Sequence, residues 1–286
     1  MIDRPTGPCH RVWVVADLQY PALAERCLSV AIDDLEQLAV DIDAIWYLGD
    51  AATSRFDGDP TASPEVRLLE QLDQPLRFVM GNHDVERICV DGGQSVPMHD
   101  VVTANPDWRT TPSLDSFYFL DRLGPFDVLF LSDHVAPDGS WCVHHGEHRH
   151  GDPDAYPYST ADYRAVIDEL AVRDRPLITA AHTSFPGGNR ASSLQGRLLP
   201  LPDSVRLHLY GHAHIGDRDH LRNPYQTISY VQDQPIPQID VASLEDRRDG
   251  LIRSVFLEAY DDGSCVVSFR DHTNGRWLES YHRPGP

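Results

Sequence analysis

The sequence predicts an α/β protein in which two packed β-sheets are flanked by helices. Strand and helix patterns alternate over residues 11–80, an order typical of parallel strands, and the C-terminal third of the chain carries strand patterns alone. With 286 residues, 41% of them hydrophobic, the chain is long enough to bury a large core. We therefore expect one domain over residues 1–286, in which a β-rich part, about residues 215–286, completes the pair of sheets.

The first half of the chain reads as strand, helix, strand, helix, strand. Apolar residues over Arg11–Ala16 predict a first strand, and apolar residues near helical spacing predict a helix over Ala22–Ala39. Asp43–Leu48 predicts a second strand, Pro64–Leu72 a helix with proline near its first turn, and Leu76–Met80 a third strand. The carboxyl ends of these parallel strands should meet at one edge of the sheet, where open α/β sheets bind ligands.

The second half contains one further helix and a series of strands. Ser116–Leu120 and Val128–Leu131 predict two strands around a Gly124-Pro125 turn, and Ser159–Val172 predicts a helix with Ser159 as its N-cap. The remaining predicted strands are Leu177–Ala181, Val205–Tyr210, Thr227–Val231, Gln238–Val241, Ile252–Tyr260 and Cys265–Arg270. An Asp-Asp-Gly turn joins the last two as a hairpin.

The chain is strongly acidic. It has 44 acidic residues against 24 basic ones, all of them arginine, and its net charge is −20. A field of this sign disfavours binding to nucleic acid or anionic lipid. Two explanations of the charge stay open: a GC-rich genome that favours arginine and aspartate, or an acidic coat adapted to high salt.

Apolar runs, the start of the chain and the cysteines indicate in which compartment the protein is expected. No apolar run approaches the roughly 18–20 residues that span a bilayer, and the start of the chain carries an early acid and a proline instead of a secretory signal. The five cysteines are scattered and never form a Cys-x-x-Cys pair, which argues against a disulfide framework and a thiolate zinc site. We expect reduced thiols in a cytoplasmic protein with no membrane partner.

Polar residues with metal-binding side chains follow the predicted strands. They are Asp17, Gly49-Asp50, Gly81-Asn82-His83-Asp84, His182 and Gly211-His212-Ala213-His214. Oxygen and imidazole donors without a thiolate suit Mn, Fe or Zn. The set offers more donors than one ion accepts, so two adjacent cations are expected.

In this order, these motifs resemble the calcineurin-like metallophosphoesterase family, over about residues 11–214. The resemblance implies a four-layer αββα sandwich of two mixed β-sheets flanked by helices. It also implies metal-dependent hydrolysis of a small phosphomonoester or phosphodiester by a metal-bridging hydroxide. The expected metal is Mn²⁺, with Fe or Zn as alternatives.

The resemblance implies a role for each matching residue. Asp17 and His214 would hold one metal, Asn82, His182 and His212 the second, and Asp50 would bridge both. His83 would stabilise the developing charge or protonate the leaving oxygen, with Asp84 orienting its ring. For Asp84 an equal alternative is an acid at a helix N-terminus.

The chain departs from the family pattern at three places. Gln19 stands where the first motif usually has histidine, and a neutral amide either ligates weakly or orients a water, so the first metal site should be weak. Ala51-Ala52-Thr53 lacks the tyrosine of purple acid phosphatases, and Val85-Glu86 replaces the Ser-Arg pair of Ser/Thr protein phosphatases. The remaining resemblance is to bacterial and archaeal small-molecule phosphoesterases, including the cyclic-nucleotide phosphodiesterase branch.

Two further features stay open. Arg190, in the loop after His182, could clamp phosphate or be a surface charge, and the histidine-rich loop His144–His150 could be a lid, a metal site or a solvated loop. Two alternative functions are a nuclease of the same fold, which the acidic balance disfavours, and a degenerate metal- or nucleotide-binding scaffold, which Gln19 motivates.

If the charge of −20 is an adaptation to salt, the melting temperature should rise steeply as KCl is raised from tenths of molar to molar. The reason is that salt screens the repulsion between surface carboxylates. Thermal melts in a KCl series measure this dependence. A flat profile would leave genome composition as the sufficient explanation.

Overall fold

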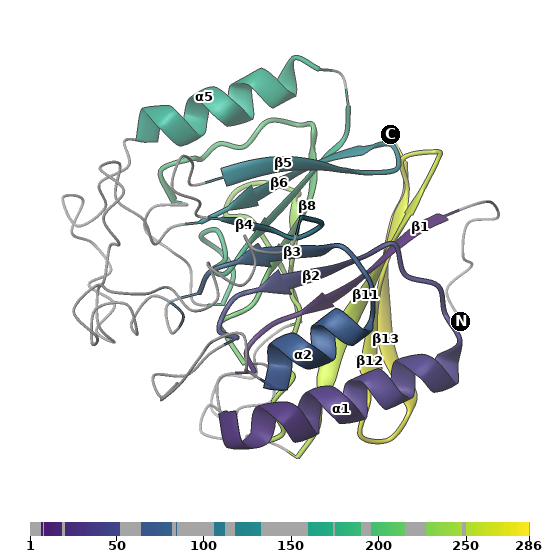
Figure 1. The fold of residues 1–286 in the computed structure, drawn as a ribbon. Coiled ribbons are helices and arrows are strands. Elements are labelled where there is room, and N and C mark those ends of the chain that lie inside the picture. The colour runs from purple at the N-terminus through teal and green to yellow at the C-terminus, as the bar shows by residue number, and fades with distance from the viewer. Residues whose placement is uncertain are drawn as a thin grey trace, which may run out of the picture.

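A computed structural model describes residues 7, 9–18, 21–51, 64–81, 84, 106–111, 118–132, 160–173, 175–189, 196–214, 227–247 and 250–285 of the chain. In this part, two sheets lie face to face between helices (Figure 1). Among the described residues, no helix is long and apolar enough to span a membrane.

The larger sheet has seven strands within the described residues, in the order β13-β12-β11-β1-β2-β3-β4. They are β1 (Cys9–Val15), β2 (Ala44–Leu48), β3 (Leu76–Val79), β4 (Arg109–Thr111), β11 (Arg253–Tyr260), β12 (Cys265–Asp271) and β13 (Arg276–Arg283). β1 to β4 are parallel neighbours, whereas β11, β12 and β13 pair in antiparallel fashion. The sheet is therefore mixed, as expected.

The smaller sheet has six strands in the same described part, in the order β5-β6-β7-β8-β10-β9. They are β5 (Tyr118–Leu123), β6 (Phe126–Leu131), β7 (Leu177–Ala181), β8 (Val205–Tyr210), β9 (Ile228–Tyr230) and β10 (Pro237–Asp240). β6, β7, β8 and β10 are parallel, and the edge strands β5 and β9 are antiparallel to their neighbours. This sheet is mixed as well.

The helices cover the outer faces of the sheets, and the strand period of two sorts the core into layers. α1 (Pro21–Leu38) and α2 (Pro64–Gln71) lie against the larger sheet, and α5 (Thr160–Ala171) lies on the opposite side, over the smaller one (Figure 1). In β1, Trp13 and Val15 pack toward the helices, whereas Val12 and Val14 pack against the other sheet. The αββα expectation is confirmed.

The predicted elements are found with small shifts of their ends, and two strands were not predicted. β5 (Tyr118–Leu123) runs past its expected end at Leu120, up to the turn at Gly124, and its expected start at Ser116 lies outside the described residues. The missed strands are both sheet edges. β4 has only three residues, and β13 is half exposed, so neither carries the apolar alternation of a buried strand.

A buried ionic cluster fastens α1 to the larger sheet. Arg270 donates two hydrogen bonds to Asp34, at 2.6 and 2.8 Å, and Nδ1 of His272 lies 2.8 Å from the same carboxylate. Burial alone would raise the pKa of Asp34, but these hydrogen bonds hold that pKa below its ordinary value. The carboxylate is therefore charged and paired.

Asp34→Ala should lower the free energy of unfolding by about 3–5 kcal/mol, because it leaves the Arg270 guanidinium buried without its carboxylate. Chemical denaturation measures this change. The matched control is Glu169→Ala, which breaks the exposed pair between Glu169 and Arg173 and should cost about 0.5 kcal/mol or less. Equal effects of the two substitutions would contradict the structural role of the cluster.

Candidate metal centre

The carboxyl ends of strands from both sheets meet at one place. Asp17 follows β1 and Asp50 follows β2, while His182 follows β7, and His212 and His214 follow β8. The loop after β1 is hydrogen-bonded to the loop after β2: the Asp17 amide donates to the Gly49 carbonyl at 3.0 Å, and the Leu18 amide donates to the Asp50 carbonyl at 3.0 Å. Backbone contacts thus set the relative positions of the two carboxylates.

The backbone is strained at four of these five residues. Asp17, Asp50, His212 and His214 have φ values of 58°, 59°, 70° and 50°. Non-glycine residues rarely adopt such left-handed conformations, and those that do concentrate at functional sites. Four of the five residues with metal-binding side chains therefore have a backbone conformation typical of functional sites.

Glycines allow the loops to approach one another. A Cβ atom on Gly81 would lie 2.2 Å from Oδ1 of Asp50, and one on Gly211 would lie 2.8 Å from Oδ2 of Asp17. A Cβ atom on Gly49 would lie 2.4 Å from Nδ1 of His182. Each of these distances is too short for a side chain, so the glycines of the three motifs are required by packing around the acidic and imidazole groups.

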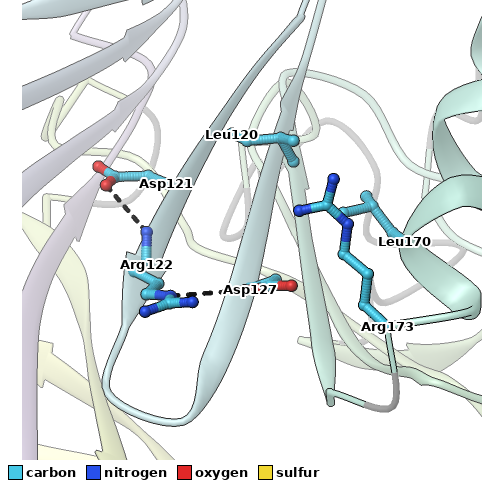
Figure 2. A pocket seen from close by; sticks show the side chains of 6 residues that line it. All are labelled: Leu120, Asp121, Arg122, Asp127, Leu170 and Arg173. Carbon is cyan, nitrogen blue, oxygen red and sulfur yellow. Dashed lines mark hydrogen bonds and ion pairs between the residues drawn. The ribbon is translucent and has the colours of Figure 1, made fainter.

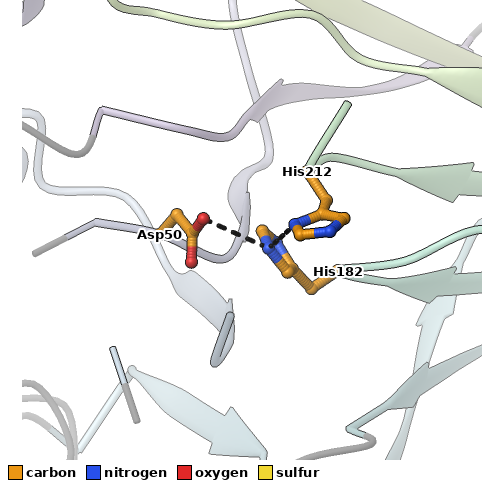
Figure 3. A group of neighbouring side chains, drawn as sticks. All are labelled: Asp50, His182 and His212. Atoms are coloured by element: carbon orange, nitrogen blue, oxygen red, sulfur yellow. Dashed lines mark hydrogen bonds and ion pairs between the residues drawn. The ribbon is translucent and has the colours of Figure 1, made fainter. Parts of the chain in front are cut away.

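The side chains form two groups that share Asp50. Asp50, His182 and His212 make one group, shown in Figure 3, and Asp17, Asp50 and His214 make the other. Within each group, one potential ligand atom per residue lies within 4.8 Å of the others. In the first group Nε2 of His182 is 3.3 Å from Asp50 Oδ2 and 3.1 Å from His212 Nδ1. In the second, Nε2 of His214 is 3.3 Å from Asp17 Oδ1.

The buried acidic groups of the site make a positive charge favourable there. Asp17, Asp50 and His182 are fully buried. Burial by itself lowers the pKa of His182, but the carboxylates of Asp50 and Asp17 outweigh it and raise that pKa to about 10. Burial raises the pKa of Asp17, against the opposing effect of His214 and His182. Burial thus makes it costly to leave the Asp17 carboxylate charged without a positive partner.

The donor set fits metal ions. Oδ1 of Asp17 is buried and has no hydrogen-bond donor among the described residues, although it lies beside His214. On the His182 ring, Nδ1 lies 2.7 Å from the Leu48 carbonyl, which can only accept, so Nδ1 carries a proton and Nε2 faces Asp50. Carboxylate and imidazole donors in this arrangement suit a first-row divalent ion.

Asp84 fixes the position of the loop that carries Asp50. Its Oδ2 accepts hydrogen bonds from the amides of Asp50 at 2.7 Å and Gly81 at 2.8 Å, and its Oδ1 accepts one from Ala51 at 3.0 Å. The carboxylate is nearly fully buried. This contact with the Asp50 backbone was not part of the sequence-based expectation, which either paired Asp84 with the ring of His83 or made it an acid at a helix N-terminus.

Several expected site residues lie outside the described part of the chain. They are Gln19, Asn82, His83, Arg190 and the loop His144–His150. Their roles stay predictions. The described part brings together the other expected residues and adds one acid that the sequence reasoning missed: Glu245, whose Oε1 lies 3.2 Å from Nδ1 of His214.

A separate pocket of about 260 Å³ lies between the β5–β6 hairpin and the C-terminal end of α5 (Figure 2). Its lining includes Asp127, the second residue of β6, and Arg173, just beyond α5. Asp127 is ion-paired with Arg175 at 3.0 Å and Asp121 with Arg77, so the acids of this pocket are already neutralised. Among the described residues, the pocket offers no ligand group like the two that share Asp50.

This fold, with carboxylates and imidazoles at the strand ends of both sheets, is that of the metallophosphoesterases. The chain belongs to the calcineurin-like phosphoesterase family, whose sequence profile matches residues 10–216. The expectation from the motifs is confirmed at the level of the family.

Known proteins resemble this chain over part of its sequence or in its fold. A UDP-2,3-diacylglucosamine hydrolase from Actinobacillus succinogenes is 32% identical over 85 residues, which are 26% of this chain and 34% of that protein. The chain therefore matches only about a third of that relative's length. A dimetal phosphatase from Danio rerio superposes with a TM-score of 0.65 at 13% identity, covering 98% of this chain and 100% of that one. A 5'-nucleotidase precursor from Thermus thermophilus gives 0.51 at 14% identity, covering 97% and 54%.

Asp84→Asn should lower the free energy of unfolding by about 1.5–3 kcal/mol and reduce metal content, because an amide cannot accept all three backbone hydrogen bonds. Denaturation and metal analysis measure the two effects. The control Asp168→Asn, at an exposed pair with Arg164, should change neither. Loss of activity with unchanged stability and metal content would instead favour the expected orientation of His83.

Proposed function

We propose that the protein hydrolyses a small phosphomonoester or phosphodiester with the help of two divalent ions. The observation that carries the proposal is the pair of ligand groups sharing Asp50, buried at the edge where both sheets end. A shared carboxylate is what two neighbouring cations need, because it offsets their mutual repulsion. When bound, such ions supply a hydroxide nucleophile at neutral pH and polarise the phosphate.

The chain's own residues divide the work in this proposal. Asp17 and His214, together with Gln19, would hold the first ion, and Asp50 would serve both ions. Asn82, His182 and His212 would hold the second ion, and the bond between His182 Nδ1 and the Leu48 carbonyl leaves Nε2 of that ring available as a ligand.

The substrate would be oriented by residues that contact no ion. His83 would hydrogen-bond the phosphate and give a proton to the leaving oxygen, and Arg190 would pair with the phosphate. Mn²⁺ is the first metal to test, with Fe and Zn as alternatives.

The type of substrate follows from charge. A chain of net charge −20 repels a polyanion, so we favour a small ester over nucleic acid. The cysteines in the described part, Cys9, Cys27 and Cys265, are free thiols, which supports a reducing, cytoplasmic setting. In this proposal residues 1–286 act as one domain, because strands after residue 226 complete both sheets.

A panel of aryl phosphates, nucleoside monophosphates and cyclic nucleotides, with Mn²⁺, Fe²⁺ and Zn²⁺ at several salt concentrations, tests the proposal. Turnover that depends on added metal supports it. Metal binding without turnover of any ester would favour the degenerate scaffold, and turnover of polynucleotides alone would favour the nuclease.

Asp50→Asn should lose metal and activity together, because Asp50 belongs to both ligand groups. His83→Ala should lose activity by about 100- to 10,000-fold and keep metal, because it acts on the leaving oxygen. Metal analysis and turnover of both variants decide this. An Asp50→Asn enzyme that stays active would contradict the assignment of two metal ions.

A further inference from the structure

Glu245 lies beside the candidate metal centre without belonging to either ligand group. It is 2% exposed, and its Oε1 is 3.2 Å from Nδ1 of His214. On the other side of the same ring, Nε2 is 3.3 Å from Oδ1 of Asp17. The imidazole of His214 is thus held between two buried carboxylates, one on each nitrogen.

The backbone around Glu245 is fastened to the loop that carries Asp17. The Leu244 amide donates to the Ala16 carbonyl at 3.1 Å, and the Ser243 hydroxyl donates to the Asp17 carbonyl at 2.8 Å. The same hydroxyl accepts from the Glu245 amide at 3.2 Å. The first two bonds link this segment to Asp17 and its neighbour, and the third holds Glu245 on the Ser243 hydroxyl, so the position of Glu245 is tied to that of the ligand group.

The chemistry of the contact follows from its two atoms. The two atoms lie at ion-pair distance, without a hydrogen bond at Nδ1 among the described residues; an ionised carboxylate at that position can only accept one, so the contact favours the tautomer of His214 that carries its proton on Nδ1. A neutral ring with Nδ1 protonated has its lone pair on Nε2, the nitrogen that faces Asp17. Histidines that ligate metals commonly donate their other N–H to a carboxylate in this way, which fixes the ring and raises its basicity.

We propose that Glu245 is a positioning residue for the first metal site: its carboxylate attracts the Nδ1–H group of His214 and so keeps the lone pair on Nε2 free to ligate. This inference rests on the two-metal site of the proposed function. In this inference the Glu245 carboxylate adds a negative charge next to the first site, where the expected ligand Gln19 is neutral. The second site has a different support, since Nδ1 of His182 donates to the neutral carbonyl of Leu48.

Calorimetric titration of the metal-free protein with Mn²⁺ tests the proposal. Glu245→Gln keeps the shape of the side chain and removes its charge, so one class of sites should weaken by about 10- to 100-fold while the other keeps its affinity. Excess Mn²⁺ should restore the activity of the variant. A merely structural role would lower the melting temperature without affecting one class of sites selectively.

The matched control is Glu258→Gln. Glu258 is 3% exposed and accepts two hydrogen bonds from Arg11, at 2.6 and 3.0 Å, so the same change removes a buried, paired charge outside the metal centre. It should lower stability and leave both classes of metal sites as they are. Equal loss of metal affinity in the two variants would overturn the proposal.

A second measurement needs no substitution in Glu245. In the Zn²⁺-loaded wild-type protein, ¹⁵N NMR of the histidine rings, assigned with a His214→Asn variant, should show His214 protonated at Nδ1. Protonation at Nε2 overturns the proposal, even if Glu245→Gln fails to fold.

The outcomes separate this inference from the proposed function. A wild-type protein that binds two ions and hydrolyses esters, while Glu245→Gln keeps both affinities, overturns the role of Glu245 alone. A wild-type protein that binds no ion overturns both.

Discussion

Two fully buried carboxylates at the meeting point of two sheets set the main constraint on this structure. Asp17 and Asp50 are both inaccessible to solvent, and a buried charge is costly unless it is paired or hydrogen-bonded. The imidazoles of His182 and His214 lie 3.3 Å from these acids, and the backbone amide of His212 donates to Asp17 at 2.8 Å. The loops, glycines and supporting acids around the site are arranged to satisfy these two groups.

The core between the sheets determines the width of the site. Val14 and Leu48 from the larger sheet, and Ala180 and Leu209 from the smaller one, belong to one buried cluster that ends where the ligand groups begin. Their side chains fill the space between the sheets at the density of a protein interior, so the separation of the strand ends is not adjustable. The acids follow strands of one sheet and the histidines follow strands of the other, hence packing of the core sets the distances in the site.

The sequence reveals strand ends and motifs, because these depend on local patterns. Asp17, Asp50, His182, His212 and His214 were all expected, and the described part of the chain brings them together. Glu245 was not expected, since it reaches His214 only because β10 pairs in parallel with β8, a contact between distant segments. The hydrogen bonds from the Asp50 loop to Asp84 likewise depend on how two loops pack, and no spacing in the sequence records that packing.

The C-terminal part of the chain contributes to the chemistry as well as to the fold. The segment from Val241 to Glu245 directly follows β10 and lies beside the site. There, Leu244 and Ser243 donate hydrogen bonds to the loop of Asp17. The next strand, β11, pairs with β1, which ends in that same loop. A chain cut before residue 227 would lose both contacts: the hydrogen bonds of Ser243 and Leu244 to the Asp17 loop, and the pairing of β11 with β1. The strands that complete the two sheets therefore also complete the support of the first ligand group.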